Sequence, residues 1–178
     1  EEGVYFDYLV NFDCLNWKYY MYVASNCFPL IKLHGSLDWG ICRKCGKTTL
    51  NFYYPHVQNF IGCSNCKTEY EPFIVVPHEK IEDKRIQQLW DNAAEKLQHA
   101  DKITVIGYSF PEYDTKAIEL FRDNIKDGTV IEVIDYKVSE KEKNMLISHY
   151  KKQFGDTILK NTNFNFDGFE KYITESKT

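Results

Sequence analysis

The fold is decided by the segment DKITVIGYSFPEYDTKAIELFRDNIKDGTVIEVID, which comprises residues 101–135. Its residues 103–107 form a short β-branched run that ends in glycine, typical of a strand buried in a parallel sheet. Apolar residues at helical spacing follow Asp114, which can cap a helix, and residues 129–135 predict a second strand. A strand, a helix and a strand in this order predict a parallel sheet with a right-handed crossover.

The flanking segments continue this alternation of helix and strand. Apolar positions recur at helical spacing over residues 82–99 and predict a helix there. Downstream, residues 157–159 and 169–173 predict one more strand and one more helix. Upstream, residues 8–10 and 30–33 read as two further strands, each ending in polar residues.

A capping box opens the helix after the second strand. Ser139 is followed three residues later by Glu142, the pattern in which each side chain bonds the other's backbone N–H. We expect the inward positions of this helix to be Met145, Leu146 and Tyr150.

Composition points to one soluble α/β domain. The chain has 178 residues, of which 43% are hydrophobic, and none of its apolar runs approaches the length of a membrane span. We expect a Rossmann-like parallel sheet whose first segment is residues 1–38, with a zinc-ribbon insert at 39–72 and a second segment at 73–178. A net charge of -4 provides no basic field for nucleic acid or membrane. The start of the chain lacks a signal-peptide pattern, so a cytoplasmic, reducing location is expected.

Four cysteines have the spacing of a structural zinc site. Cys42 and Cys45 form one C-x-x-C unit, Cys63 and Cys66 form another, and seventeen residues separate the two units. Four protein ligands leave no position open for water or substrate, so the zinc is expected to stabilise the fold. The remaining cysteines are expected to be ordinary thiols: Cys14 and Cys27.

The basic residues around these cysteines have two interpretations. Four thiolates around Zn²⁺ leave a net negative charge, which nearby lysine and arginine side chains can offset. The alternative is a nucleic-acid patch, which the acidic composition of the whole chain disfavours. The residues concerned are Arg43, Lys44, Lys47 and Lys67.

Polar residues follow four of the predicted strands. In an open parallel sheet, ligands bind outside the carboxyl ends of the strands, so these residues are the candidates for chemistry. Alternatives remain open for several of them: the acid can be a solvated turn residue, the glycine a simple tight turn, and the histidine a satisfied loop residue. The candidates are Asn11 and Asp13, His34, Gly107 and Ser109, and Asp135.

Taken together, these motifs resemble the sirtuin-like family, especially its bacterial branch found in defence proteins. The resemblance lies in Leu33-His34-Gly35-Ser36, in the two C-x-x-C units that come next, and in Val105-Ile106-Gly107-Tyr108-Ser109. Val10-Asn11-Phe12-Asp13 resembles the family's Asn-x-Asp motif, and Asp114 fits the Gly-Tyr-Ser...Asp pattern of the branch.

The resemblance implies a Rossmann-type domain that binds NAD as substrate and cleaves its nicotinamide–ribose bond. His34 would be the catalytic base, acting at the ribose or on water. Asn11 and Asp13 would line the nicotinamide pocket and position water. The adenosine ribose or the phosphates would be contacted by Gly107, Ser109 and Asp135, the last standing where many relatives have asparagine. Fixed polar groups around the oxocarbenium-like sugar would supply most of the rate.

The chain departs from the family in two places. No glycine-rich phosphate loop is present, so we expect the chain to be the later part of a longer domain and to bind NAD poorly alone. Deacylating sirtuins carry a Phe-Gly-Glu-like segment after the zinc module, whereas this chain reads Phe73-Ile-Val-Val-Pro-His-Glu-Lys80. This difference favours NAD hydrolysis over deacylation.

Three functions therefore remain to be weighed: an NAD hydrolase, including one of antiphage defence, an NAD-dependent protein deacylase, and a non-catalytic zinc-ribbon binding module. Beyond NAD itself, a second copy of the chain or an additional defence-related domain or subunit is an open alternative as partner. Neither a membrane nor nucleic acid is expected as a partner of this domain.

Overall fold

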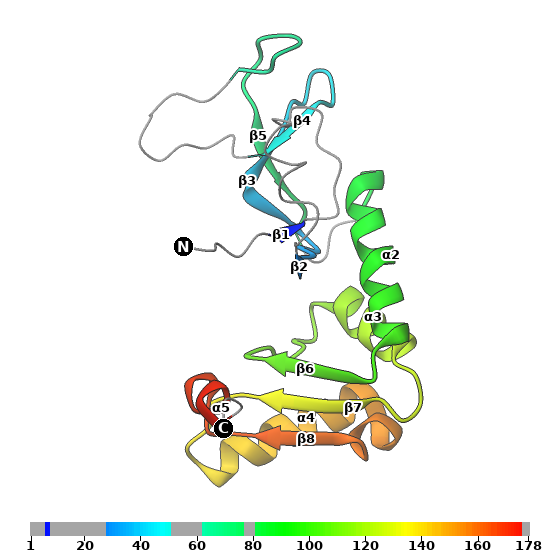
Figure 1. Ribbon diagram of the computed structural model, residues 1–178, viewed down its shortest axis with the longest axis vertical. Helices are drawn as coiled ribbons and strands as arrows, with labels where there is room; N and C mark the ends of the chain where they lie inside the picture. The colour runs from blue at the N-terminus through cyan, green and yellow to red at the C-terminus, as the bar shows by residue number, and fades with distance from the viewer. Residues whose placement is uncertain (1–5, 8–27, 51–61, 77–80, 176–178) are drawn as a thin grey trace. The chain divides into compact units, whose positions relative to one another are not determined.

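The computed structural model describes residues 6–7, 28–50, 62–76 and 81–175 (Figure 1). The chain divides into two compact units, Glu1–Asn92 and Ala93–Thr178. The boundary falls within helix α2 (Lys84–His99). In the described part of the chain, no helix combines the length and the apolar character that a membrane crossing requires.

The first unit is built on a three-stranded antiparallel sheet in the order β4-β3-β5. Its strands are β3 (Gly35–Ile41), β4 (Thr48–Leu50) and β5 (Glu71–Ile74). A short parallel pair precedes them, β1 (Phe6–Asp7) with β2 (Phe28–Pro29). The register between β3 and β5 shifts between Ser36 and Gly40, which marks an irregularity in that pairing.

The core of the first unit joins this sheet to the first turns of α2. The sheet contributes Trp39, Ile41 and Phe73, and the helix contributes Ile86 and Leu89 three residues apart on one face. Trp39, Ile86 and Leu89 are each 0% exposed. Burial of a side chain of this size contributes about 1.5–3 kcal/mol before entropy is subtracted, so this cluster stabilises the packing of β3 and β5 against α2.

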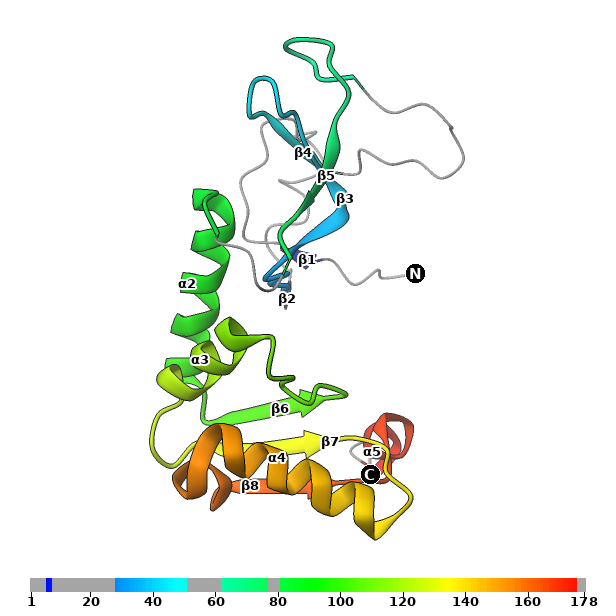
Figure 2. The same cartoon turned by 180° about the vertical axis from the view of Figure 1, so that it is seen from behind.

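The second unit is a parallel α/β layer in the order β6-β7-β8. Its strands are β6 (Lys102–Ile106), β7 (Val130–Ile134) and β8 (Thr162–Asn165). Its helices are α3 (Thr115–Asn124), α4 (Glu140–Leu159) and α5 (Phe169–Glu175). Figure 2 shows α3 and α4 on one face of the sheet.

The core of the second unit lies under α3 and α4. Val105, Ile131 and Val133 point from the sheet toward that face, and Phe121 and Tyr150 meet them from the two helices. The two residues of β7 are separated by two positions, so they share one face of the pleat. The carboxyl ends of β6 and β7 are thereby held in a fixed position.

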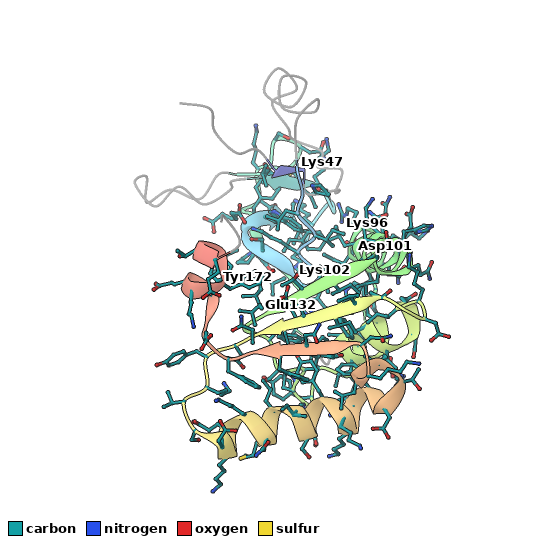
Figure 3. All side chains as sticks on the ribbon, turned by 60° about the horizontal axis from the view of Figure 1, so that its bottom comes forward. Lys47, Lys96, Asp101, Lys102, Glu132 and Tyr172 are labelled. Atoms are coloured by element: carbon teal, nitrogen blue, oxygen red, sulfur yellow. The ribbon has the colours of Figure 1, made fainter. Side chains whose placement is uncertain are left out.

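The opposite face of the sheet carries a polar network (Figure 3). Lys102 Nζ lies 2.7 Å from Glu132 Oε2, and the Tyr172 hydroxyl of α5 donates to the same oxygen at 2.8 Å. Lys102 lowers the pKa of Glu132, with Tyr172 contributing in the same direction. This network ties α5 to the middle of the sheet.

Most predicted elements of the second unit are confirmed. The predicted helix at 82–99 is α2, and the strands predicted at 103–107 and 129–135 are β6 and β7 with shifts of one residue. The capping box is present: Ser139 Oγ accepts from the Glu142 N–H at 3.2 Å, and Glu142 Oε2 accepts from the Ser139 N–H at 3.1 Å.

Two details of the second unit were predicted wrongly. Met145 was placed inward, but it is 63% exposed, while Leu146 and Tyr150 are buried as predicted. Residues 157–159 were predicted as a strand but belong to α4, which resumes after a non-helical Gly155. The strand instead spans Thr162–Asn165, a polar alternating run whose two asparagines disfavour strand on propensity alone.

The upstream strands were also misplaced in part. The chain turns where residues 30–33 were predicted to be extended, because the Gly35 N–H bonds the Lys32 carbonyl at 3.0 Å. The neighbouring strands are β2 at Phe28–Pro29 and β3 from Gly35 onward. His34 therefore lies in a turn that leads into a strand, and Gly35 and Ser36 are in the strand. The strand predicted at 8–10 lies outside the described residues.

Candidate functional site

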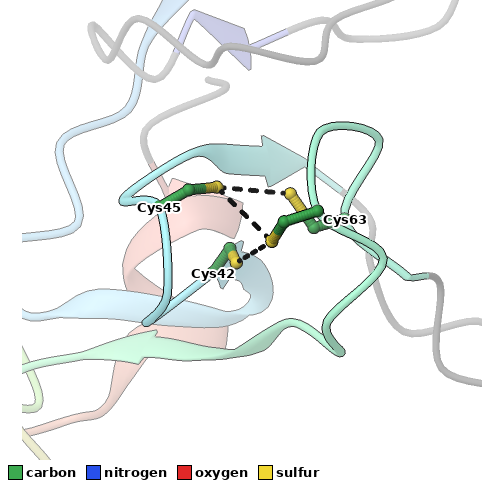
Figure 4. Close-up of side chains that lie close together, drawn as sticks. Cys42, Cys45 and Cys63 are labelled. Carbon is green, nitrogen blue, oxygen red and sulfur yellow. Dashed lines mark hydrogen bonds between the residues drawn. The ribbon is translucent and has the colours of Figure 1, made fainter.

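The four cysteines of the first unit converge on one point (Figure 4). Cys42 and Cys45 come from the turn between β3 and β4, and Cys63 and Cys66 come from the turn before β5. All four Sγ atoms lie within 4.8 Å of one another. Sulfurs about 2.3 Å from a tetrahedral zinc are about 3.8 Å apart, and the pairs here measure 3.4, 3.5 and 3.8 Å. The set fits a structural zinc ion.

The two turns that present these thiols repeat the same hydrogen bonds. The N–H of Cys42 bonds the Lys47 carbonyl at 2.8 Å, and the N–H of Cys63 bonds the Thr68 carbonyl at 2.7 Å. The fourth residue after each leading cysteine is left-handed, with φ 73° at Gly46 and 62° at Lys67. Each turn thereby presents two thiols, and together the two turns supply the four sulfurs that a tetrahedral zinc ion takes.

Local hydrogen bonding prepares the site for a cation. Burial raises the pKa of Cys42 to about 11. Cys63 is also buried, which opposes ionisation, but the backbone N–H groups of Cys66 and Asn65 lower its pKa to about 6. Thr68 lowers the pKa of Cys66. Negative charge is thus stabilised on the thiols of the turn before β5, Cys63 and Cys66. A bound metal would replace the proton on Cys42, in the turn between β3 and β4.

His34 is fixed at the start of β3 by contacts on both sides. Its carbonyl accepts from the Val75 N–H at 3.0 Å, and the preceding Leu33 carbonyl accepts from Trp90 Nε1 at 2.8 Å. The His34 ring meets the Trp90 ring edge to face, with centroids 5.5 Å apart and an angle of 76°. The Nδ1 atom of His34 is buried and, among the described residues, has no hydrogen-bond partner.

Gly35 is required by the backbone that passes beside it. Its φ is 79°, which L side chains rarely adopt, and a Cβ built on it would lie 2.0 Å from the Phe73 carbonyl oxygen of β5. Only glycine lets β3 and β5 approach at this register. The glycine of the His-Gly pair therefore places the histidine at the sheet.

A polar cluster flanks His34 in the sequence, with Lys32 before the histidine and Ser36 and Asp38 after it on β3. Lys32 Nζ donates to Ser36 Oγ at 2.7 Å and lies 3.4 Å from Asp38 Oδ1, and the Ser36 hydroxyl in turn donates to Asp38. The cluster fixes the Ser36 hydroxyl two residues from the histidine.

In the second unit, Gly107 and Asp135 stand at neighbouring strand ends. Gly107 has φ 62°, and its N–H bonds the carbonyl of Ile134, the residue before Asp135, at 2.9 Å. Asp135 Oδ1 accepts from the Tyr136 N–H at 2.7 Å, and Oδ2 lies 3.1 Å from Lys137 Nζ. The two residues predicted to end neighbouring strands are therefore adjacent in the structure.

Ser109 lines a groove of about 850 Å³ along the first half of α4. The groove carries both signs of charge together with apolar side chains. Its other lining residues include Lys137, Lys141, Glu142, Met145 and His149.

The loop between β6 and α3, residues 107–114, is held by α4 and by its own side chains. Tyr150 donates its hydroxyl to the Tyr108 carbonyl at 2.7 Å, and His149 Nε2 lies 2.8 Å from the Phe110 carbonyl, which can only accept. The Tyr108 hydroxyl donates to the buried Asp114 carboxylate, so burial and this bond raise the pKa of Tyr108. Asp114 stands at the N-cap of α3, but its side chain makes no capping bond.

The predicted site residues are divided between the two units. His34 and the four cysteines belong to the first unit, and Gly107, Ser109 and Asp135 belong to the second. Asn11 and Asp13 lie outside the described residues. Sequence reasoning missed the role of Trp90, which orients His34, and of Tyr150, which anchors the loop. Both were read only as apolar helix positions, because a periodic pattern does not show what an indole N–H or a phenol hydroxyl bonds.

Comparison of the sequence with known proteins identifies one related enzyme. No family model matches the chain. In sequence, it is 28% identical over 111 residues to NAD-dependent protein deacetylase 1 of Geobacillus kaustophilus (strain HTA426), covering 62% of this chain and 42% of that protein.

Solved structures of Sir2 homologues share the fold of this chain. One is a mutant Sir2 homologue in complex with ADP-ribose, with a TM-score of 0.52, 16% identity and coverage of 87% of this chain and 53% of that one. Another is a Sir2 homologue–NAD complex, with a TM-score of 0.50, 16% identity and coverage of 88% and 55%. The chain spans about half the length of the relatives it matches.

Proposed function

We propose that this chain, which is sirtuin-like in sequence and in fold, is part of an enzyme that consumes NAD. The reaction that we propose is hydrolysis of the nicotinamide–ribose bond to give nicotinamide and ADP-ribose. The observation that carries the proposal is His34: its ring is fixed against Trp90, and its buried Nδ1 has no partner among the described residues. A buried polar atom without a partner is costly unless a ligand or catalysis uses it.

In this reaction His34 acts as the base. Water attacks the anomeric carbon of the ribose, the bond to the nicotinamide nitrogen breaks, and nicotinamide leaves as a neutral ring. The proton lost by the water passes to His34 and then to solvent. Asn11 and Asp13 would position that water, and Gly107, Ser109 and Asp135 would hold the adenosine end. The zinc ion would only stabilise the fold, because four thiolates complete its coordination.

The test is NAD turnover by the full-length protein that contains this chain. His34→Ala should reduce the rate of nicotinamide release at least about 100-fold, the usual contribution of a general base. His99→Ala is the matched control, because His99 is exposed on α2 and its ring lies against the Glu95 carbonyl one turn earlier on the same helix. His34→Ala should keep the far-ultraviolet circular dichroism spectrum of the wild type, which shows that the fold is retained. Undiminished turnover in this variant would refute the assignment.

Hydrolysis is preferred to deacylation because of the segment after the zinc module. Deacylating sirtuins pair a Phe-Gly-Glu-like segment there with the acyl-lysine peptide. In this chain neither glycine nor an acid follows Phe73 directly, since the segment reads Phe73-Ile-Val-Val-Pro-His-Glu-Lys80, and the Phe73 side chain is buried in the core of the first unit.

Deacylation remains the second candidate, because the sequence relative is named a deacetylase. Nicotinamide release that needs no acylated peptide supports hydrolysis. Release that occurs only with an acetyl-lysine peptide, together with loss of its acetyl group, supports deacylation.

A role in bacterial antiphage defence is part of the same proposal. It is supported by the Leu-His-Gly-Ser motif and by the Gly-Tyr-Ser...Asp pattern of residues 107–114, which resemble the defence-associated branch. Cells that carry the intact gene should lose NAD on phage infection, and cells that carry the His34→Ala gene should not. Equal NAD levels in both would count against this role.

A further inference from the structure

The hydroxyl of Ser36 lies between a carboxylate and an ammonium group of the first unit. It donates to the Asp38 carboxylate and accepts from Lys32 Nζ at 2.7 Å. Lys32 Nζ also lies 3.4 Å from Asp38 Oδ1 and 5.8 Å from the centroid of the Trp39 ring, so the ammonium group is fixed by three contacts. A nucleophile that is bonded to a base, with a third group that orients both, is the arrangement that activates a hydroxyl for attack.

This cluster is open enough to meet a substrate. The side chains of Lys32 and Asp38 are 29% and 37% exposed, and Ser36 is only partly buried. A hydroxyl oxygen carries two lone pairs, and the ammonium group of Lys32 takes one of them. The other lone pair remains for attack on an electrophilic carbon.

Ser36 is also close to the residue that we propose as the base. It follows His34 by two positions, so the Cα atoms of the two residues are at most about 7 Å apart. In glycosidases, the two side chains that act on one sugar are about 5–9.5 Å apart. A ribose bound against His34 is therefore within reach of the Ser36 hydroxyl.

We propose that Ser36 is a modification site, which accepts ADP-ribose from NAD in place of water. The proposal rests on the NAD-cleaving function proposed above. The Ser36 oxygen forms a bond to the anomeric carbon, and the bond from that carbon to the nicotinamide nitrogen breaks. Nicotinamide leaves as a neutral ring, the hydroxyl proton passes to Asp38 and then to solvent, and no oxidant or reductant takes part.

A carboxylate is a sufficient base for this transfer. The sugar is oxocarbenium-like when it is attacked, and a carboxylate base activates the attacking oxygen in glycoside hydrolysis through the same kind of transition state. A hydroxyl held on the same chain also acts at a high effective concentration, on the order of 10⁵ M or more for well-oriented groups. Ser36 can therefore compete with water, and the modification stops once this one hydroxyl is used.

The experiment incubates the full-length protein with NAD that is labelled in its adenosine half. The wild type should carry covalent label that resists neutral hydroxylamine, because an acetal bond to a serine oxygen survives this reagent and an ester to a carboxylate does not. Trypsin cleaves after Lys32 and Arg43, so the label should lie in the peptide Leu33–Arg43, in which Ser36 is the only residue with a hydroxyl group.

The readout for the variants is bound ADP-ribose per nicotinamide released, so a general loss of activity is not counted. Ser36→Ala should reduce this ratio to background. The matched control Ser148→Ala, at an exposed serine of α4, should keep the ratio of the wild type.

Two further variants keep the test valid if Ser36→Ala folds poorly. Asp38→Asn retains the shape of the side chain and the Ser36 hydroxyl but removes the base, so the rate of labelling should fall at least about 100-fold. Ser36→Thr keeps a hydroxyl group and should still be labelled on the same peptide. A purely structural role of the cluster would leave all these proteins unlabelled.

The two proposals fail in different ways. Free ADP-ribose without any label on Leu33–Arg43 overturns the role of Ser36 and leaves hydrolysis standing. Label on this peptide without free ADP-ribose overturns hydrolysis and leaves the role of Ser36 standing. A label that hydroxylamine removes, or that persists in Ser36→Ala, also contradicts the assignment to Ser36, and a protein that releases no nicotinamide overturns both proposals.

Discussion

Replacing Gly35 by alanine should unfold or nearly unfold the first unit, because two separate penalties act at this position. The new Cβ would lie 2.0 Å from the Phe73 oxygen and 3.0 Å from the Phe73 carbonyl carbon, and real Cβ atoms essentially never approach within 3.0 Å. β3 and β5 would therefore have to separate by about 1 Å, the difference between 3.0 and 2.0 Å. The backbone would also hold an alanine at φ 79°.

The size of the effect can be summed from these terms. A left-handed backbone costs a non-glycine residue about 1–2 kcal/mol. Forcing a packed region apart costs about 1–3 kcal/mol, and weakening the adjacent bond from Val75 N–H to the His34 carbonyl adds about 1 kcal/mol. The total, on the order of 3–6 kcal/mol, is comparable with the whole stability of a typical domain, about 5–15 kcal/mol.

Urea unfolding followed by tryptophan emission measures this loss, because Trp39 and Trp90 both lie in the first unit. Gly46→Ala is the matched control: Gly46 has φ 73°, but a Cβ there meets no atom within 4 Å. Gly46→Ala should lose only the stability that a left-handed backbone costs a non-glycine residue, about 1–2 kcal/mol. Lys67, at the equivalent position of the other cysteine turn, already adopts such a backbone, with φ 62°. Equal losses in the two variants would refute the close-approach argument.

Two further predictions concern the zinc site and the buried tyrosines. Cys63→Ser removes one of four thiolates, so bound zinc measured by atomic absorption after dialysis should fall from about one ion per chain to nearly none. The control variant Cys27→Ser should keep its zinc. Full zinc content in Cys63→Ser would contradict the zinc site. Burial raises the pKa of Tyr108 and Tyr150 above the ordinary 10.0, and for Tyr108 the Asp114 carboxylate adds to the effect. The unfolded chain then loses these protons first, so the free energy of unfolding should fall as the pH rises above about 10. Tyr150→Phe should make that fall shallower in urea titrations at pH values of about 8 and about 10.5, and identical slopes would count against the assignment.

The sequence predicted best the elements that a repeating pattern defines. The β-branched runs of β6 and β7 and the apolar stripe of α2 each specify one structure, because burial of one face leaves few alternatives. The four cysteines were predicted from spacing alone, since metal geometry limits what the chain between them can do.

Failures occurred where long-range contacts decide the structure. The turn before His34 depends on the bond from Gly35 to Lys32 and on the approach of β5, and neither is visible in residues 30–33 alone. Strand β8 has asparagines at alternate positions, and Phe164 between them packs against the core under α4, which favours a strand there. Asp114 was expected to cap α3, but the Tyr108 hydroxyl takes its carboxylate.

The candidate site residues other than the cysteines stay predictions, and the sequence did not show which side chains support them. His34, Gly107 and Asp135 stand out because each lies at the end or the start of a strand beside a distinctive motif. Trp90 bonds the backbone beside His34, and Tyr150 bonds the loop that follows Gly107. In the sequence both look like ordinary core positions of a helix. Their donors find partners only once distant segments are packed together.

The most direct test of the central claim is the product balance of the full-length protein incubated with NAD and no acylated peptide. Nicotinamide and ADP-ribose should appear in equal amounts in the wild type and in His99→Ala, and should be absent or reduced at least about 100-fold in His34→Ala. Equal product formation by His34→Ala, or no loss of NAD in any sample, would contradict the account.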